Sequence, residues 1–170
     1  TEVLDGELRY VVQVGSERGA RIAQALGGRP ATDADDADAA AVTAGAREAM
    51  GRHVDADGLP NLLATNLDHP RWEEVAERCL TCGNCTMACP TCFCTSVDDV
   101  NLLEGDVTER HRHWDSCFSV EYSHIHGGAV RPTGRSRYRQ WLTHKFGTWV
   151  EQFGTSGCVG CGRCVTWCPV

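Results

Sequence analysis

Cys79-Leu80-Thr81-Cys82-Gly83-Asn84-Cys85-Thr86-Met87-Ala88-Cys89-Pro90 is the stretch that decides the interpretation of this chain. Its spacing, C-x2-C-x2-C-x3-C-P, returns at Cys158-Val159-Gly160-Cys161-Gly162-Arg163-Cys164-Val165-Thr166-Trp167-Cys168-Pro169. Cysteines at this spacing are the ligands of [4Fe-4S] clusters in bacterial ferredoxins. The two copies therefore predict two [4Fe-4S] clusters, and they account for eight of the eleven cysteines.

The two motifs are expected to exchange their last ligands. Three cysteines close in sequence can curl around one cubane, and glycines within the loop permit the tight turns and bring backbone N–H groups near the sulfurs. The fourth cysteine of each run ligates the other cluster in two-cluster ferredoxins. The expected ligand sets are Cys79, Cys82, Cys85 and Cys168 for one cluster, and Cys158, Cys161, Cys164 and Cys89 for the other.

Three cysteines remain after this assignment: Cys92, Cys94 and Cys117. Cys92 and Cys94 follow the first motif so closely that we expect them near the clusters, as buried thiols packed around inorganic sulfide. The alternatives are a swapped ligand, in which Cys92 or Cys94 replaces Cys89, and a redox-active thiol pair. For the motifs themselves, the alternatives are paired zinc sites or a disulfide framework.

Composition limits the class of protein. The chain has 170 residues, 42% of them hydrophobic, and no apolar run of the roughly 18 residues that a membrane helix needs. A net charge of −7 argues against general nucleic-acid binding. Clustered C-x2-C spacing without an export signal favours metal binding in a reducing compartment, the cytoplasm. The ends of the chain lead us to expect a piece of a longer protein.

The predicted fold class is mostly α: an α-helical ferredoxin domain over residues 59–170, preceded by a small α/β or irregular segment over residues 1–58. Alternating apolar residues predict a strand within residues 1–14, and Ser16 is placed to cap a helix that ends at Gly27. Residues 31–46 are expected to be a solvated linker or a helix start. Further helices are expected over residues 44–53, 59–65 and 70–78.

Residues 90–157 separate the motifs, and periodic apolar positions predict helices over residues 97–103, 107–114 and 137–153. Within this segment, residues 131–145 carry five positive charges and no acid, which form a docking surface, a counter-charge for an anionic cluster or a solvated helix face. Paired histidines raise the alternative of a metal site. The basic residues are Arg131, Arg135, Arg137, Arg139 and Lys145, and the histidines are His111, His113, His124, His126 and His144.

The sequence resembles a known family at residues 79–94, at Trp114-Asp115-Ser116-Cys117, in the basic run and at residues 157–164. It is similar there to the electron-transfer β subunits of cytoplasmic sulfhydrogenase-type [NiFe] hydrogenases and to the A subunit of anaerobic sulfite reductases. The resemblance implies an α-helical dicluster ferredoxin domain within a longer subunit. It also implies partners: a flavin subunit that uses NAD(P)H, and the small and large hydrogenase subunits.

The expected function is a non-catalytic electron-transfer subunit of an oxidoreductase complex. It relays single electrons through two [4Fe-4S] clusters between the flavin subunit and a catalytic partner, a [NiFe] hydrogenase. The alternatives are the same relay in an anaerobic sulfite or sulfur reductase, a cluster-based redox sensor and a zinc-stabilised scaffold.

Overall fold

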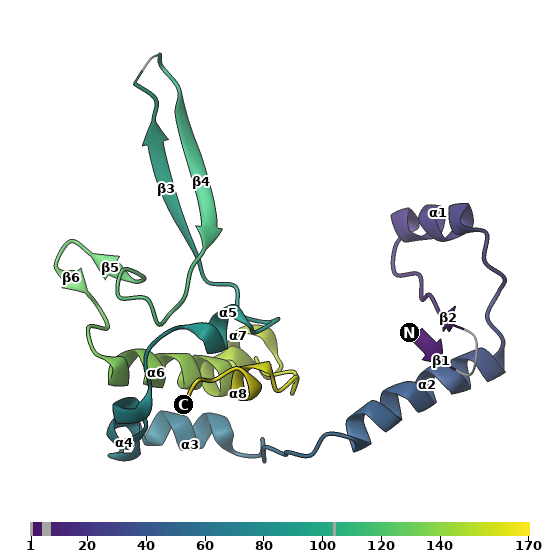
Figure 1. Cartoon of the computed structure of the whole chain (residues 1–170), viewed down its shortest axis with the longest axis horizontal. Helices are drawn as coiled ribbons and strands as arrows, with labels where there is room; N and C mark the ends of the chain where they lie inside the picture. Colours follow the sequence, from purple (N-terminus) through teal and green to yellow (C-terminus); the bar gives the residue numbers. More distant parts are fainter. Residues whose placement is uncertain (1, 5–7, 104) are drawn as a thin grey trace. The chain divides into compact units, whose positions relative to one another are not determined.

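The chain folds into two compact units, residues 1–54 and 55–170, as seen in a computed structural model (Figure 1). The structure describes residues 2–4, 8–103 and 105–170. The units meet four residues before the boundary expected from the sequence, between residues 58 and 59.

The first unit is a small α/β element. Strands β1 (Glu2–Leu4) and β2 (Leu8–Tyr10) pair antiparallel, and helices α1 (Glu17–Leu26) and α2 (Asp33–Glu48) follow. The predicted strand is therefore shorter than residues 1–14, part of which lies outside the described residues. The predicted cap is confirmed: Ser16 Oγ accepts a hydrogen bond from Gly19 N at 3.1 Å, and left-handed Gly27 ends α1.

Helix α2 corrects the expectation for residues 31–53. One helix fills the Ala- and Asp-rich span, and residues 50–53, which were expected to be helical, are not. Thr32 starts the helix through a capping box with Asp35, in which each side chain binds the other residue's backbone N–H. Acidic residues in the first turn also suit the positive end of the helix dipole. The local cap decides where this helix begins.

Asp35 links the elements of the first unit. Its buried carboxylate accepts hydrogen bonds from Arg29 at 2.7 Å, from Arg9 of β2 at 3.0 Å and from Thr32. The hydrogen bond from Arg29, followed by those from Thr32, holds the pKa of Asp35 well below its usual range. The carboxylate is therefore the charged centre of a shared network.

The second unit is built on helices that position the two cysteine motifs. Helices α3 (Leu59–Thr65) and α4 (Arg71–Arg78) confirm two predicted helices. The helix predicted over residues 137–153 is also present, as α6 (Gly134–Thr143), the π-helical turn η1 (His144–Thr148) and α7 (Trp149–Phe153). It packs against α3 and α4. The short helices α5 (Asn84–Met87) and α8 (Arg163–Thr166) belong to the motifs and contact each other.

The insert between the motifs corrects the mostly-α prediction, because the fold is mixed. Residues predicted as two helices form a hairpin of β3 (Thr95–Asn101) and β4 (Thr108–Trp114), and β5 (His124–Ile125) pairs with β6 (Gly128–Ala129). In the first hairpin Asp99 lies opposite Arg110, whose Nε donates to it at 2.7 Å. Cross-strand ion pairs and β-branched residues favour strands where the three-residue apolar spacing suggested a helix.

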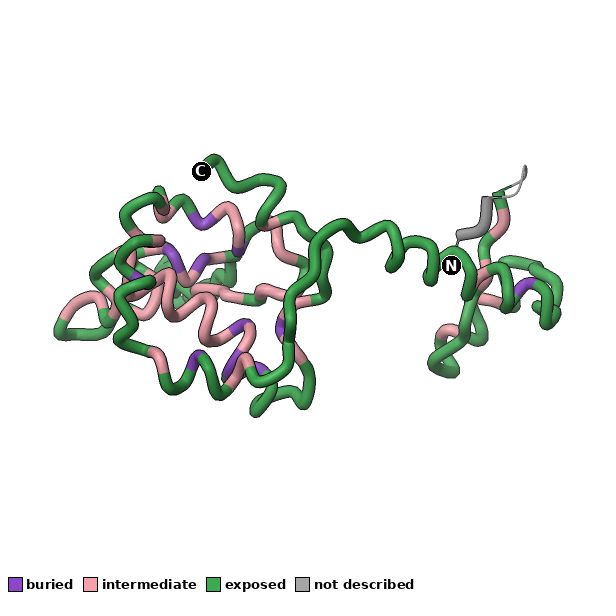
Figure 2. The backbone as a smooth tube through the Cα atoms, turned by 90° about the horizontal axis from the view of Figure 1, so that it is seen from below, coloured by how far each residue is buried: buried purple, intermediate pink, exposed green. Residues whose placement is uncertain are grey.

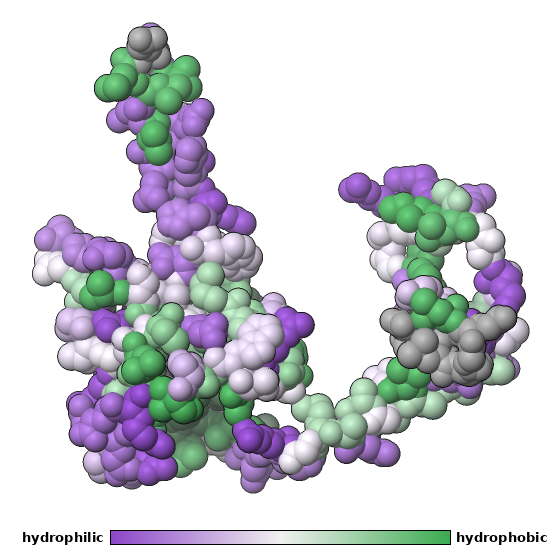
Figure 3. All heavy atoms as spheres, viewed as in Figure 1, coloured by the Kyte–Doolittle hydropathy of each residue, from purple (hydrophilic) through white to green (hydrophobic). Residues whose placement is uncertain are grey.

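The hairpin β3–β4 extends from the helices and ends in an apolar tip, seen as green spheres in Figure 3. Leu102, Leu103 and Val107 there are all exposed. The buried apolar residues among those described are few: Leu63, Trp72, Phe118 and Trp149. Figure 2 shows the same scarcity of buried backbone positions in the second unit. No described helix is long and apolar enough to cross a membrane.

We expect the first unit to lose stability in acid through Asp35. Its lowered folded-state pKa stabilises the unit at a pH above about 4, and that stabilisation is lost as the pH falls through the lowered value. Hydrogen exchange of α1 and α2 in the full chain measures the effect. Asp35→Asn should lower the protection factors of these helices at pH 7 and flatten their decrease as the pH falls below about 4.

The matched control is Asp36→Asn, at an exposed position in the first turn of the same helix. It should leave the pH dependence of exchange close to that of the wild type. Equal effects of the two substitutions would contradict a special role for Asp35.

Candidate iron-sulfur centres

The first motif forms a tight loop between two helices. Helix α4 ends at Arg78, and the backbone turns left-handed at Thr81 (φ 51°) and Gly83 (φ 73°) before α5 begins. A left-handed conformation costs a non-glycine residue about 1 to 2 kcal/mol. The strained backbone at Thr81 therefore marks a turn that the surrounding fold imposes. This turn curves the loop that carries the three cysteines.

The second motif repeats this turn. Gly160 (φ 70°) and Gly162 (φ 71°) occupy the positions of Thr81 and Gly83, and α8 follows as α5 does. In both motifs a backbone N–H group also donates to the sulfur of the first cysteine. Thr81 N donates to Cys79 Sγ, and Gly160 N donates to Cys158 Sγ, both at 3.4 Å. Hydrogen bonds to ligand sulfurs tune the reduction potential of a cluster, so both loops are shaped for that task.

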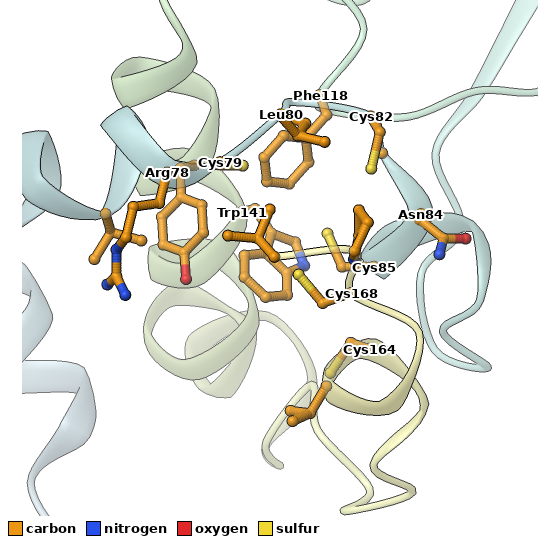
Figure 4. A pocket seen from close by; sticks show the side chains of 16 residues that line it. Arg78, Cys79, Leu80, Cys82, Asn84, Cys85, Phe118, Trp141, Cys164 and Cys168 are labelled. Atoms are coloured by element: carbon orange, nitrogen blue, oxygen red, sulfur yellow. The ribbon is translucent and has the colours of Figure 1, made fainter.

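A cavity of about 290 Å³ lies inside the first loop (Figure 4). The sulfurs of Cys82, Cys85 and Cys168 point toward its middle. Cys168 comes from the end of the second motif, so the fold brings a distant cysteine to the first loop. Aromatic side chains close the remaining wall. The cavity is lined by Cys79, Cys82, Cys85, Cys164 and Cys168, with Phe118, Tyr138 and Trp141 among its other residues.

The thiols of the second expected ligand set also lie close to one another. The thiol of Cys164 is close enough to Cys158, Cys89 and Cys161 for their charges to act on it, and burial together with these charges raises its pKa. In the same way, burial and its neighbours Cys79, Cys164 and Cys82 raise the pKa of Cys85 to about 12. Several thiols this close need cations to become thiolates together, which a cluster's irons supply.

One hydrogen bond joins the two motifs directly. Asn84 Nδ2, at the start of α5, donates to Trp167 O, at the end of α8, at 2.6 Å. The two residues are 83 positions apart. Sequence spacing gave no sign of this contact, because nothing in either motif demands an asparagine at the helix start.

Lys145 is a buried positive charge that contacts Cys89 of the second ligand set. Its Nζ donates to Cys89 Sγ at 3.3 Å, to Thr91 Oγ1 at 2.9 Å and to Gly157 O at 3.0 Å, and only 5% of the residue is exposed. Burial raises the pKa of Cys89, but hydrogen bonds from Thr91 and Lys145 outweigh it and lower that pKa to about 7. The position of Lys145 therefore fits one of the roles expected for the basic residues, that of a counter-charge for an anionic cluster.

The other basic residues of that run have structural partners. Arg131 donates to Ser123 Oγ, Arg137 to the carbonyls of Arg131 and Pro132, and Arg139 to the carbonyl of Leu67, while Arg135 lies 3.5 Å from Glu73. These contacts tie α6 to its neighbours. The histidines of the hairpin are exposed and pair with acids, His111 with Glu109 and His113 with Asp98.

Cys92, Cys94 and Cys117 gather at a second cavity of about 210 Å³. The neighbouring Cys117 thiol is the largest influence on the pKa of Cys94, which falls to about 6, and Cys94 in turn raises the pKa of Cys117. Burial raises the pKa of Cys92 to about 11. All eleven cysteines are free thiols, so no disulfide framework is present in this structure.

We expect Gly83→Ala to destabilise the protein more than Gly162→Ala, by about 1 to 3 kcal/mol. Both glycines are left-handed, with φ of 73° and 71°, so each substitution carries the same backbone strain. Only at position 83 would the new Cβ also meet a neighbour, Ser116 Oγ at 2.9 Å. Ser116 cannot yield easily, because it bonds Thr86 Oγ1 at 2.6 Å and Phe118 N at 3.1 Å.

Chemical denaturation of anaerobically purified protein measures this difference, together with the iron that each variant retains. Equal losses in the two variants would show that the contact with Ser116 does not constrain the first loop.

Comparison with curated proteins finds a similar hydrogenase subunit. The chain is 36% identical over 123 residues to sulfhydrogenase 2 subunit beta from Pyrococcus furiosus, an alignment that covers 72% of this chain. The chain spans 36% of the length of that relative. No solved structure shows a significant match to the chain.

Two family models match the chain, and each describes a 4Fe-4S dicluster domain. One covers residues 78–170 and the other covers residues 39–93. The first match contains both cysteine motifs and all three remaining cysteines. The convergence of thiols from the two loops, with backbone N–H groups on their sulfurs, fits two [4Fe-4S] clusters, as this family implies. The chain therefore belongs to the 4Fe-4S dicluster domain family of iron-sulfur electron-transfer proteins.

Proposed function

We propose that this chain is the electron-transfer part of a hydrogenase-like complex. It passes single electrons between a flavin subunit that uses NAD(P)H and a catalytic partner, a [NiFe] hydrogenase. The chain itself carries out no bond chemistry. The observation that supports this proposal best is the meeting of the two motifs at α5 and α8, where Asn84 binds Trp167 O, because adjacent clusters can exchange electrons rapidly.

The ligand assignment within this proposal is crossed. Cys79, Cys82, Cys85 and Cys168 hold the first cluster, and Cys158, Cys161, Cys164 and Cys89 hold the second. The lining of the first cavity and the neighbours of Cys164 support these sets. When bound, each cluster supplies one-electron redox chemistry. The protein orients the thiols and places N–H donors and Lys145 beside the sulfurs.

The similarity to a sulfhydrogenase beta subunit supports the choice of partners. A cytoplasmic location follows from the same proposal, since reduced thiols and clusters suit a reducing compartment. The apolar tip of the hairpin β3–β4 offers a surface that a partner subunit would cover.

Affinity purification of the tagged native protein under anaerobic conditions tests the proposed partners. We expect flavin and hydrogenase subunits to co-purify, and NADH or NADPH to bleach the visible absorption of the clusters only when the flavin subunit is present. A lone dimer that binds DNA would contradict the relay in favour of a sensor. Zinc without acid-labile sulfide would contradict the clusters altogether.

Serine substitutions test the crossing. We expect Cys168→Ser to perturb the cluster bound by the first loop, because Cys168 lines that loop's cavity. Cys89→Ser should perturb the cluster of the second loop, because Cys89 lies beside Cys164. Electron paramagnetic resonance of the reduced protein distinguishes the two signals once Cys82→Ser and Cys161→Ser have assigned them.

Those two variants are matched controls, since each removes a ligand from the middle of its own loop. If Cys168→Ser instead reproduced the spectrum of Cys161→Ser, each motif would hold its own cluster and the crossing would be wrong.

A further inference from the structure

Three cysteines that the two motifs leave unused meet in one place. Cys92 and Cys94 lie between α5 and β3, whereas Cys117 follows β4. The hairpin explains how they meet: Thr95 pairs with Trp114, and Asp115 N donates to Cys94 O at 2.9 Å just beyond that pair. Closing the base of the hairpin therefore brings Cys117 near Cys94, and both residues line the same cavity.

The place where they meet is a cavity separate from that of the first motif. It has a volume of about 210 Å³, and the three cysteines share its lining with the cationic side chains of Lys145 and Arg131. His144 and Tyr122 also line it. Thiols grouped with positive side chains form an environment that stabilises a bound anionic cluster, because the cations offset the charge of the thiolates and sulfides.

The second cavity also lies next to both predicted centres. Cys92 is close enough to Cys89, and Cys117 to Cys85, for the charge of one thiol to act on the other. Lys145 joins the two environments, because its amino group reaches Cys89 Sγ while its side chain lines the second cavity. A redox centre here would have both predicted clusters as neighbours.

The spacing of the ligands distinguishes between kinds of metal centre. A single zinc ion holds its sulfur ligands about 2.3 Å away, and therefore within about 4 Å of one another. Among the described residues, no three His, Cys, Asp or Glu side chains are gathered closely enough to hold one ion, and this is equally true of the cysteines that line the first cavity. A cubane binds each cysteine through a different iron, so its ligands need not approach one another as closely as those of a single ion.

We propose that Cys92, Cys94 and Cys117 bind a third [4Fe-4S] cluster in this cavity. All eleven cysteines are then ligands, and the fourth iron has no cysteine of its own. Tyr122 and His144, which line the same cavity, are the candidate non-cysteine ligands for that iron. This inference does not depend on the identity of the partner subunits.

Native mass spectrometry of the full chain, reconstituted anaerobically with ferrous iron and sulfide, tests it without any substitution. We expect a bound mass equal to three cubanes, with about twelve irons and about twelve sulfides per chain. Alkylation of the native protein with iodoacetamide should leave Cys92, Cys94 and Cys117 unmodified until the clusters are destroyed by oxidation and chelation.

Cys117→Ser and Cys94→Ser should each lower the iron content to about eight per chain and remove one set of resonance signals. Gln140→Ala is the matched control, because Gln140 lines the same cavity but is not among the proposed ligands. It should keep all the iron. If a serine variant fails to fold and loses every cluster, the mass of the wild type still decides.

About eight irons in the wild type, with these three thiols alkylated or with Cys94 and Cys117 joined in a disulfide, would overturn the third cluster and leave the proposed relay intact. One zinc ion beside about eight irons would overturn it as well. A wild type that binds no cluster would contradict both the third cluster and the proposed function.

Discussion

The second unit depends on the contact between the two cysteine loops. Each loop ends in a single helical turn, and α5 and α8 meet where Asn84 donates to Trp167 O. Without this contact Cys168 would not reach the cavity of the first loop, nor Cys89 the thiols of the second. The few buried apolar residues suggest why metal centres matter for stability as well: bound clusters add long-range links that a small core does not provide.

Lys145 connects the cysteine loops to the long helical segment formed by α6, η1 and α7. It lies in the π-helical turn η1, and its amino group contacts Cys89, Thr91 and the carbonyl of Gly157 just before the second motif. Gly157 has no room for a side chain, because a Cβ there would lie 2.7 Å from Lys145 O and from the Trp149 ring. One helix turn therefore positions the last cysteine of the first motif and the entry to the second.

Local signals predicted most helices and missed the hairpin. Ser16, Gly27 and the aromatic stripe of α6 to α7 act within one or two turns, so their helices were predictable from sequence. Residues 97–114 carry apolar residues at spacings that fit a helix, but Asp99 finds Arg110 only across a pair of strands. That pairing joins residues on two different strands, so the apolar pattern within one segment cannot predict it. The partners of Arg131 to Arg139 were hidden for the same reason.

The sequence by itself determined the cofactor: four cysteines at cubane spacing, present twice, specify two [4Fe-4S] clusters, because ligand type and spacing follow from the chemistry of the cluster. It also indicated the glycines that the second loop needs. Only the tertiary structure brought Cys168 to the first loop, buried Lys145 beside Cys89, and gathered Cys92, Cys94 and Cys117 at one cavity. Those contacts depend on the hairpin register and on helix packing between distant segments, and local sequence patterns do not predict either of them.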